Sequence, residues 1–361
     1  MKIVHLAPYY YPDFGGGSAV SLFSLNNEFS NHKKIIISEG LNRKNHKNHI
    51  IISDNHEVFY YHRFSFKIYY TIFKECLNAD YIQTSSFFFP PNFFAYIFSK
   101  IFKKNLIISP RGEFFEFAIN KKRRSKFFLI KLFNLLISRV NFHATSDEEV
   151  KIIKKRIHNK KNIKIYKIPN SFESKFSFST RRKRQILFLG RINPIKNIHS
   201  LFEILVNLND VKYLIAGEAI LKNEKNYLNF LKKEIKKYNL EDKVEFLGKL
   251  SGEKKFKIIS TSKCLVLPSY SENFGNVVLE SLSQSTPVIA SHSTPWGVLE
   301  EFKCGFHEDF SLKNNLVNKI NFFLEMDDIF FENLKFNCQN LLDKFSSKII
   351  KDKWINLYNS N

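Results

Sequence analysis

Short apolar segments alternate with longer amphipathic segments along the first half of the chain. The apolar segments, each of which is typical of a buried strand, include KIVHLA, KKIIIS, NLIISP and IKIYKI. Helix-like runs such as SAVSLFSLNNEF and PNFFAYIFSKIF separate most of them. Because strands that alternate with helices form βαβ units, the pattern predicts a doubly wound α/β domain.

The alternation stops at PNSFESKFSFSTRRKRQ (residues 169–185), a polar, serine-rich and charged stretch that we interpret as a linker. It restarts with QILFLG, VKYLIAG, KVEFLG, KCLVLPS and TPVIAS, and after residue 310 only helical patterns remain. We therefore predict an α/β fold of two Rossmann-like domains that face each other across a cleft. The domains are expected at residues 1–172 and 173–345, followed by a C-terminal helix at 346–361.

Three of the later predicted strands end in glycine, at Gly190, Gly217 and Gly248. Ligands of open parallel sheets bind outside the carboxyl ends of the strands, and glycine lets the backbone approach a ligand closely. An ordinary strand-to-loop turn would explain any one of these glycines. The three together favour a binding site at this edge.

The stretch PSYSENFGNVVLESLSQSTPVIAS (residues 268–291) places two carboxylates around a predicted helix start. Glu272 lies in the loop after a strand, Gly275 opens the helix, and Glu280 lies about two turns further on. Backbone N–H groups at a helix start favour an anion. The motif offers an anion site and two acceptors for sugar hydroxyls, although a glutamate at a helix start or in mid-helix is often only solvated.

Two basic residues follow the first strand of the second half, Arg191 and Lys196 in LGRINPIKNI. A guanidinium and an ammonium at a strand's carboxyl end suit a diphosphate. With 56 basic residues in the chain the spacing alone is common, so the position carries the argument. No DxD pattern occurs, and this predicts that charge neutralisation falls to these cations and to helix N-termini rather than to a metal.

A glycine loop, FGGGS, joins the first strand to the first helix and contains Gly16 and Gly17. It is not a GxGxxG dinucleotide motif. It is either a flexible turn or a place where backbone amides contact a phosphate or an acceptor.

The net charge of the 361-residue chain is +22, which is compatible with nucleic acid, an anionic membrane surface or phosphate-bearing substrates. Four scattered cysteines without a CxxC pair indicate neither a zinc site nor a disulfide framework, and fit the cytoplasm. The start MKIVHLA is expected to be a strand rather than a signal peptide, and no apolar run is long enough to span a membrane.

Four stretches carry a resemblance to a known family: FGGGS, LGRINPIKN, ENFGNVVLE and TPVIASHSTPW. Across nearly its full length the chain resembles the retaining glycosyltransferases of the GT-B fold, family 4. SPRGEF and HSTPW are similar to the bacterial surface-polysaccharide branch of that family. The resemblance implies a first domain for the acceptor, a second for the nucleotide-sugar, and a C-terminal helix that packs back on the first.

The resemblance also implies roles for residues. Glu272 would contact the transferred sugar, Glu280 the ribose hydroxyls, and Arg191 and Lys196 the diphosphate, with catalysis assigned to Glu272, Arg191 and Lys196. Arg111, in SPRGEF where many relatives carry a histidine, would contact donor or acceptor. The backbone amides that would meet the sugar and phosphates are those of Phe274, Gly275, Asn276 and Val277.

The implied reaction retains the anomeric configuration and needs no metal or other cofactor. The donor would be a UDP-linked hexose or N-acetylhexosamine, with GDP-mannose open. The acceptor would be a saccharide or lipid-linked saccharide for O-antigen, capsule or lipopolysaccharide, handled by a cytoplasmic enzyme peripheral on the inner face of the plasma membrane.

NKKRRSKFFLIKLFNLLISR (residues 120–139) sets a basic cluster beside a Phe/Leu stripe, so it could lie on an anionic membrane surface. Alternatively, the stripe packs on the sheet and the charges face water.

Two other classes of protein remain as alternatives. A nucleotide-sugar epimerase of the same fold would need carboxylates for proton abstraction, and no convincing pair is found. A nucleic-acid-binding protein is suggested by charge alone. The basic residues of this chain are spread over its whole length without a nucleic-acid recognition motif, so nucleic acid is not the expected partner.

Overall fold

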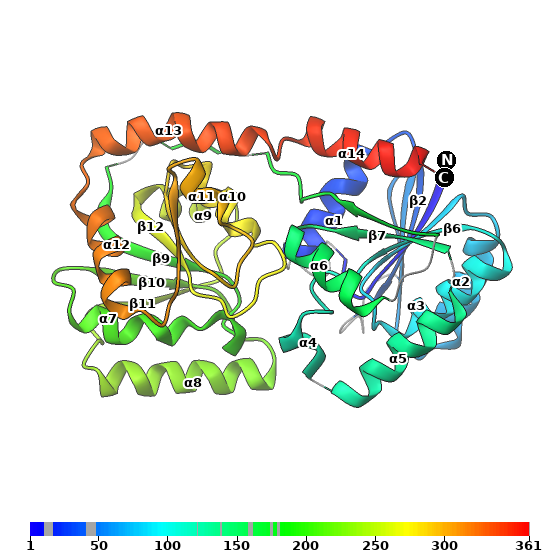
Figure 1. The fold of residues 1–361 in the computed structure, drawn as a ribbon, viewed down its shortest axis with the longest axis horizontal. Helices are drawn as coiled ribbons and strands as arrows, with labels where there is room; N and C mark the ends of the chain where they lie inside the picture. Colours follow the sequence, from blue (N-terminus) through cyan, green and yellow to red (C-terminus); the bar gives the residue numbers. More distant parts are fainter. Residues whose placement is uncertain are drawn as a thin grey trace. The chain divides into compact units, whose positions relative to one another are not determined.

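The computed structural model describes residues 1–10, 17–40, 48–120, 122–137, 139–157, 162–173, 176–178 and 181–360. The chain divides into two compact units (Figure 1). The first comprises Met1–Ser171 and Ser347–Asn361, and the second comprises Phe172–Ser346.

The first unit is built on an eight-stranded sheet in the order β3-β4-β2-β1-β5-β6-β7-β8. All neighbouring strands are parallel except β3, an edge strand that pairs antiparallel with β4 and was not predicted. The inner strands are apolar on both faces because helices cover both. The strands are β1 (Lys2–Ala7), β2 (Lys33–Glu39), β3 (His49–Ser53), β4 (His56–Tyr61), β5 (Tyr81–Ser85), β6 (Asn105–Ser109), β7 (Arg139–Ala144) and β8 (Asn162–Lys167).

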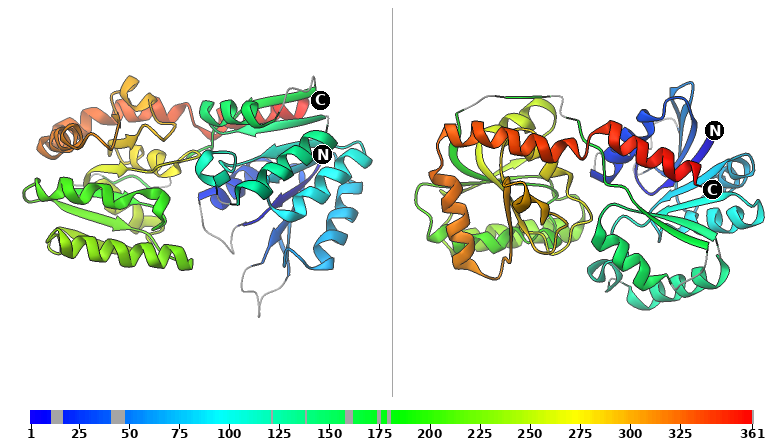
Figure 2. Two further views of the ribbon diagram at one scale, coloured as in Figure 1. Left: turned by 60° about the horizontal axis from the view of Figure 1, so that its bottom comes forward. Right: turned by 45° about the horizontal axis from the view of Figure 1, so that its top comes forward.

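Two helices far apart in sequence share one face of this sheet, α1 (Gly17–Glu28) and α14 (Ser347–Asn359). They lie side by side in Figures 1 and 2, and the buried side chains of α14 pack with those of β1 and α1 in one apolar cluster. The other face is covered by α2 (Phe66–Leu77), α3 (Pro90–Ile101), α5 (Arg123–Leu136) and α6 (Asp147–Arg156), with the short α4 (Glu116–Asn120) before α5.

The termini of α6 show why helices form where they do. The Ser146 side chain accepts a hydrogen bond from the backbone N–H of Glu149, which caps the helix. Three acidic residues follow in the first turn and three basic residues occupy the last, which complements the helix dipole.

The second unit has a six-stranded parallel sheet in the order β11-β10-β9-β12-β13-β14. The predicted α/β fold is confirmed. The linker ends earlier than expected, because β9 begins inside it. The strands are β9 (Lys183–Leu189), β10 (Lys212–Ala216), β11 (Val244–Gly248), β12 (Ser262–Leu267), β13 (Val288–Ser291) and β14 (Gly305–Glu308).

Helices cover both faces of this second sheet (Figure 1). One face packs against η2 (Ile198–Leu201), α7 (Phe202–Val206), α8 (Lys222–Lys237) and α12 (Lys313–Glu325), and the short η1 (Pro194–Lys196) precedes η2. The other packs against α9 (Gly252–Thr261), α10 (Asn276–Leu282), α11 (Val298–Glu301) and α13 (Asp328–Asp343). This packing leaves the loops after the strands to form the edge where a ligand is expected.

Candidate functional site

The three strand-end glycines lie together at the carboxyl edge of the second sheet. The N–H of Gly190 donates to the carbonyl of Ala216 at 3.0 Å, and the N–H of Gly217 donates to the carbonyl of Gly248 at 2.8 Å. A Cβ on Gly217 would lie 1.8 Å from the carbonyl oxygen of Gly190. Backbone packing therefore requires glycine at 217 whether or not a ligand binds there.

Lys196 and Glu272, two predicted site residues 76 positions apart, form an ion pair at this edge. Only 16% of each side chain is exposed. Lys196 is the last residue of η1, which Asn193 caps by accepting a hydrogen bond from the N–H of Ile195 at 3.1 Å. The N–H of Tyr270 donates to the carbonyl of Ile195 at 2.8 Å and ties the two loops together.

Gly275 lies between the two carboxylates of the motif in a left-handed conformation, with φ of +83°. A Cβ there would come within 3.1 Å of Cγ of Glu272 and 3.2 Å of Nε1 of Trp296. The buried Trp296 donates its indole N–H to the carbonyl of Phe274. Trp296 thus fixes the loop, a role that sequence reasoning did not assign although HSTPW had been singled out.

Glu280, on α10, is paired rather than merely solvated. Its Oε1 accepts a hydrogen bond from Nζ of Lys255 on α9 at 2.8 Å. The two side chains are 18% and 20% exposed. Sequence reasoning missed Lys255, because nothing in GEKKF distinguishes it from the other lysines of the chain.

Arg191 is the most exposed cation of the site, with 55% of its side chain accessible, and Nη1 lies 3.6 Å from Oε1 of Glu224. Glu224 is buried and accepts hydrogen bonds from Asn193 and from the N–H groups of Ile220 and Leu221. Burial alone would raise the pKa of Glu224, but these hydrogen bonds together with the charge of Arg191 lower it. The buried carboxylate of Glu224 thus lies beside Arg191, the cation that is predicted to bind the diphosphate.

Arg111 belongs to the first unit, where it takes a left-handed φ of +54°. Its Nη1 donates to Oδ1 of Asn170 at 2.9 Å, and its buried Nε has no hydrogen-bond partner in the part of the chain that the structure describes. Burial, helped by the charge of Arg111, lowers the pKa of His5 and of His143 to about 3. The arrangement offers a cation beside two neutral imidazoles.

Glu113, the carboxylate of SPRGEF, is anchored in the first unit. It accepts hydrogen bonds from the hydroxyl of Ser86 and from the N–H groups of Phe87 and Phe88. Its contacts hold the loop before α3. Gly16 lies outside the described residues, and Gly17 is the first residue of α1.

Among the described residues of the predicted membrane segment, Asn120 ends α4, Arg123–Leu136 form α5, and Arg139 already belongs to β7. Ile130 and Phe133 are buried against the sheet, whereas Phe128 and Leu135 are 65% and 78% exposed. The packing alternative therefore describes the buried apolar side chains, and membrane contact stays a prediction for the exposed ones. Lys121 lies outside the described residues.

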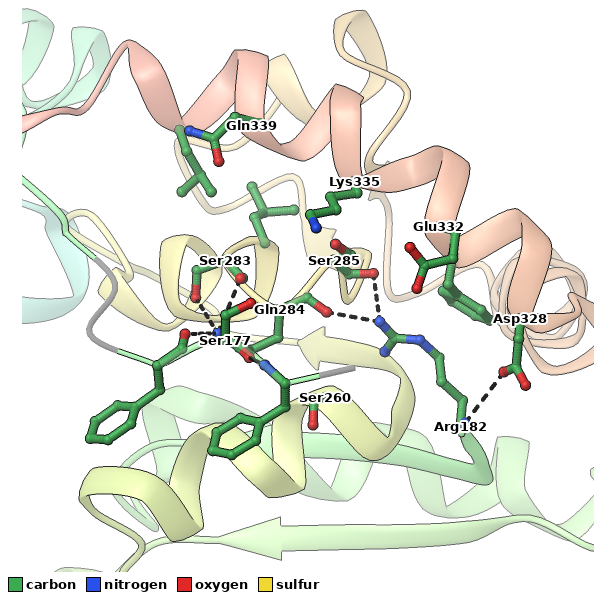
Figure 3. A pocket seen from close by; sticks show the side chains of 15 residues that line it. Ser177, Arg182, Ser260, Ser283, Gln284, Ser285, Asp328, Glu332, Lys335 and Gln339 are labelled. Atoms are coloured by element: carbon green, nitrogen blue, oxygen red, sulfur yellow. Dashed lines mark hydrogen bonds between the residues drawn. The ribbon is translucent and has the colours of Figure 1, made fainter. Parts of the chain in front are cut away.

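A cavity of about 390 Å³ lies elsewhere in the second unit, between α13 and the residues before β9 (Figure 3). The guanidinium of Arg182 donates to the carbonyls of Ser262, Gln284 and Ser285 and to the hydroxyl of Thr286. Burial lowers its pKa to about 10. These partners lie at the amino ends of β12 and β13, away from the edge where parallel sheets bind ligands.

Within the described ranges, no three His, Cys, Asp or Glu side chains are grouped so that they could hold a metal ion. The helices of the same ranges include none that is both long and apolar enough to cross a membrane.

Comparison with known proteins identifies the part of the chain that carries the site. Residues 170–338 match the family described as Glycosyl transferases group 1. This segment is a glycosyl transferases group 1 domain. The group 1 domain contains Arg191, Lys196, Glu272 and Glu280, and it covers the described strands of the second sheet.

Curated relatives of the chain are glycosyltransferases by name. It is 26% identical over 204 residues to a poly(ribitol-phosphate) alpha-N-acetylglucosaminyltransferase of Staphylococcus aureus, covering 55% of this chain and 38% of that protein. It is 26% identical over 206 residues to a Campylobacter jejuni alpha-1,4-N-acetyl-D-galactosaminyltransferase named for an undecaprenol-linked saccharide, covering 55% and 54%. The chain thus spans only about a third to a half of these relatives.

Among solved structures, HepE of Anabaena in complex with UDP superimposes with a TM-score of 0.79 at 18% identity, covering 100% of both chains. Sucrose-phosphate synthase of Thermosynechococcus elongatus gives a TM-score of 0.82 at 17% identity, covering 100% of this chain and 99% of that one. These likenesses show a shared fold, that of the GT-B glycosyltransferases.

Proposed function

We propose that the chain is a retaining glycosyltransferase of family 4 that transfers a hexose or N-acetylhexosamine from a nucleotide-sugar. The observation that carries the proposal is the ion pair of Lys196 and Glu272 between the loops after two strands of a group 1 domain that also contains Arg191 and Glu280. UDP is the first candidate nucleotide, since the structural neighbour HepE was solved with UDP and with UDP-glucose.

The residues act through position and charge. In the proposed mechanism Lys196 and Arg191 stabilise the negative charge that develops on the leaving diphosphate, which lowers the energy of the transition state. Glu272 and Glu280 provide oxygens for hydroxyls of the sugar and the ribose, and the amides of residues 274–277 complete the donor site. On this proposal the leaving phosphate accepts the proton of the acceptor hydroxyl on the same face, so the configuration is retained without a metal.

We further propose a saccharide or lipid-linked saccharide acceptor and a role in bacterial surface-polysaccharide synthesis on the inner face of the plasma membrane. The support is the name of the Campylobacter relative, which includes an undecaprenol-linked saccharide, and the resemblance of SPRGEF and HSTPW to that branch. The first unit would hold this acceptor, with Arg111 as a contact to donor or acceptor.

A donor screen tests the proposal. Calorimetry with UDP-, GDP- and dTDP-sugars should find one donor that binds. Glu280→Gln should reduce the binding free energy of that donor by about 1.5–3 kcal/mol, because hydrogen bonds to the ribose are lost. Glu253→Gln, an exposed glutamate on α9, is the matched control and should bind like the wild type.

Binding of none of these donors, or equal weakening by both substitutions, would count against the proposed site. The metal-free mechanism is tested separately, because transfer should continue in EDTA. A loss of transfer that Mn²⁺ or Mg²⁺ restores would contradict it.

A further inference from the structure

Large apolar side chains are concentrated on the outer surface of three helices of the first unit, α2, α3 and α5. These helices carry ten of the twenty-five exposed large hydrophobic residues found in the described part of the chain. The helices are neighbours: the rings of Tyr69 and Phe94 are 4.5 Å apart between α2 and α3, and Nζ of Lys100 on α3 donates to the carbonyl of Leu136 on α5 at 2.9 Å.

On α2 the exposed side chains form a regular stripe. Phe66, Tyr70, Phe73 and Leu77 are 81%, 59%, 44% and 46% exposed. They recur at intervals of four, three and four residues, which places them on one side of a helix. The buried residues of α2 face the sheet, so this stripe is a second apolar side that the core does not use.

On α3 the exposed apolar residues are Phe94, Ile97 and Ile101, at 42%, 42% and 61%. Their spacing of three and four residues again defines one side of the helix. Because α2 and α3 pack against each other, the two stripes form one surface, which we call the α2–α3 face. A contiguous apolar surface that the core does not use is a candidate interaction site in a globular protein.

The charges around the α2–α3 face are almost all positive. α2, α3 and α5 together contain seven basic residues and one acidic residue, Glu75. Glu75 is 13% exposed and pairs with Lys2 at 2.8 Å, so it does not offset the exposed lysines Lys67, Lys74 and Lys100. An apolar surface with basic residues around it is complementary to anionic headgroups over acyl chains.

A second copy of the chain is a poorer fit to the same surface. Two copies would bring lysines of like sign together, and each chain already carries a net charge of +22. Like charges across an interface oppose association. On an anionic bilayer, by contrast, each lysine is attracted to the headgroups and each apolar side chain that becomes buried adds to the binding free energy.

We propose that the α2–α3 face docks the protein on an anionic lipid bilayer, with Phe66, Tyr70 and Ile101 entering the interfacial layer and Lys67 and Lys74 contacting headgroups. The proposal rests on the proposed function for its purpose, which is to bring the acceptor site to a lipid-linked saccharide. It assigns the main apolar contact to α2 and α3 rather than to the basic helix α5.

The test is flotation with vesicles of phosphatidylglycerol and phosphatidylcholine in equal parts, and with phosphatidylcholine alone. The wild type should float with the anionic vesicles. Phe66→Ser/Ile101→Ser should lower the partition coefficient at least about tenfold. The control Ile329→Ser/Phe336→Ser removes one isoleucine and one phenylalanine of similar exposure, 69% and 71%, from α13, and should float like the wild type.

The lysines are tested in the same way at low and at physiological salt. Lys67→Gln/Lys74→Gln should lower the partition coefficient about tenfold at low salt, and by a smaller factor at physiological salt, where charges are screened. Lys232→Gln/Lys233→Gln, on exposed lysines of α8, should change it far less. Failure of the wild type to float, or equal loss in test and control pairs, would overturn the proposal.

Two further measurements separate the alternatives. If Arg123→Gln/Arg124→Gln abolishes flotation while Phe66→Ser/Ile101→Ser does not reduce it, α5 alone is the docking helix and the proposal fails. If sedimentation shows a dimer that Phe66→Ser/Ile101→Ser converts to a monomer with flotation unchanged, the face is a self-interface and the proposal again fails.

Calorimetry with the donor separates this proposal from the proposed function. Donor binding should be equal in the wild type and in Phe66→Ser/Ile101→Ser, because the variant leaves the second unit untouched. Loss of flotation with donor binding intact supports the docking surface. The expected flotation pattern in a protein that binds no nucleotide-sugar would support the surface and refute the proposed function.

Discussion

The charged residues of the candidate site occur as compensated pairs. Lys196 pairs with Glu272 and Lys255 with Glu280, and these four side chains are only 16–20% exposed. Removing one member of such a pair leaves the other partly buried and unpaired, which costs stability as well as function. Mutational tests at this site must therefore separate the two effects.

Lys196→Met should lower kcat by roughly 10²–10³, because it removes a cation from the leaving diphosphate. It should also lower the free energy of unfolding by about 1–3 kcal/mol, since Glu272 is left without its partner. In Lys196→Met/Glu272→Gln the stability should recover and the turnover should not, as urea unfolding and initial rates will show. Turnover that recovers together with stability would mean that the pair is only structural.

Gly275→Ala should destabilise the loop between the two carboxylates. The left-handed φ costs an alanine about 1–2 kcal/mol, and the new Cβ would also press on Glu272 and Trp296. Gly252→Ala is the matched control, because Gly252 has a left-handed φ of +55° with no atom within 4 Å of its Cβ position. Thermal unfolding should show a larger loss for Gly275→Ala, and equal losses would mean that the contacts relax without cost.

At the scale of elements, the packing of α14 shows how the end of the chain completes the first unit. Ile350, Trp354 and Leu357 join the apolar cluster formed by β1 and α1. The hydroxyl of Tyr358 donates to Oε1 of Gln83 on β5 at 2.9 Å. Residues from the end of the sequence therefore complete the cover of a sheet face that α1 begins.

Trp354→Ala should lower the stability of the first unit by about 3–5 kcal/mol, since the indole is buried and its ring centroid lies 4.6 Å from that of His143. Phe336→Ala on α13, 71% exposed, should change little. Hydrogen exchange resolved by peptide should show the loss of protection in β1, α1 and β7. Loss confined to the second unit would contradict this assignment of α14.

At the scale of the whole molecule, buried histidines make stability depend on pH. The pKa of His5 is lowered from 6.5 to about 3 by burial, and then by the charges of Arg111 and neighbouring histidines. Below pH 6.5 His5 is therefore protonated in the unfolded chain but stays neutral in the folded protein. The contribution of His5 to the free energy of unfolding is therefore full above pH 6.5 and falls as the pH drops towards 3.

Urea unfolding of the wild type and of His5→Gln, at pH 7 and at pH 5, measures this contribution. The stability advantage of the wild type should shrink by about 2 kcal/mol between the two pH values. Taking the difference between the two proteins cancels the titration of the other groups. A difference that does not change with pH would show that His5 is not held neutral.

The hydrophobic pattern by itself determined the fold class, because short apolar strands alternating with helices have few other solutions. It also placed Gly275, Glu272 and Glu280 on one strand–loop–helix segment, since these positions are close in sequence. The edge strand β3 was missed although HIIIS contains three consecutive isoleucines, because no helix separates it from β4, with which it pairs antiparallel, and the strand–helix alternation does not predict such a hairpin.

Only the tertiary structure decided which partners the site residues have. Lys196 meets Glu272 across 76 positions, and Glu280 takes Lys255 from another helix. Trp296 fixes the loop from 22 positions away. With 56 lysines and arginines in the chain, no local pattern distinguishes the ones that pair with these carboxylates, because an ion pair depends on a distance in space that only the packing of strands and helices sets.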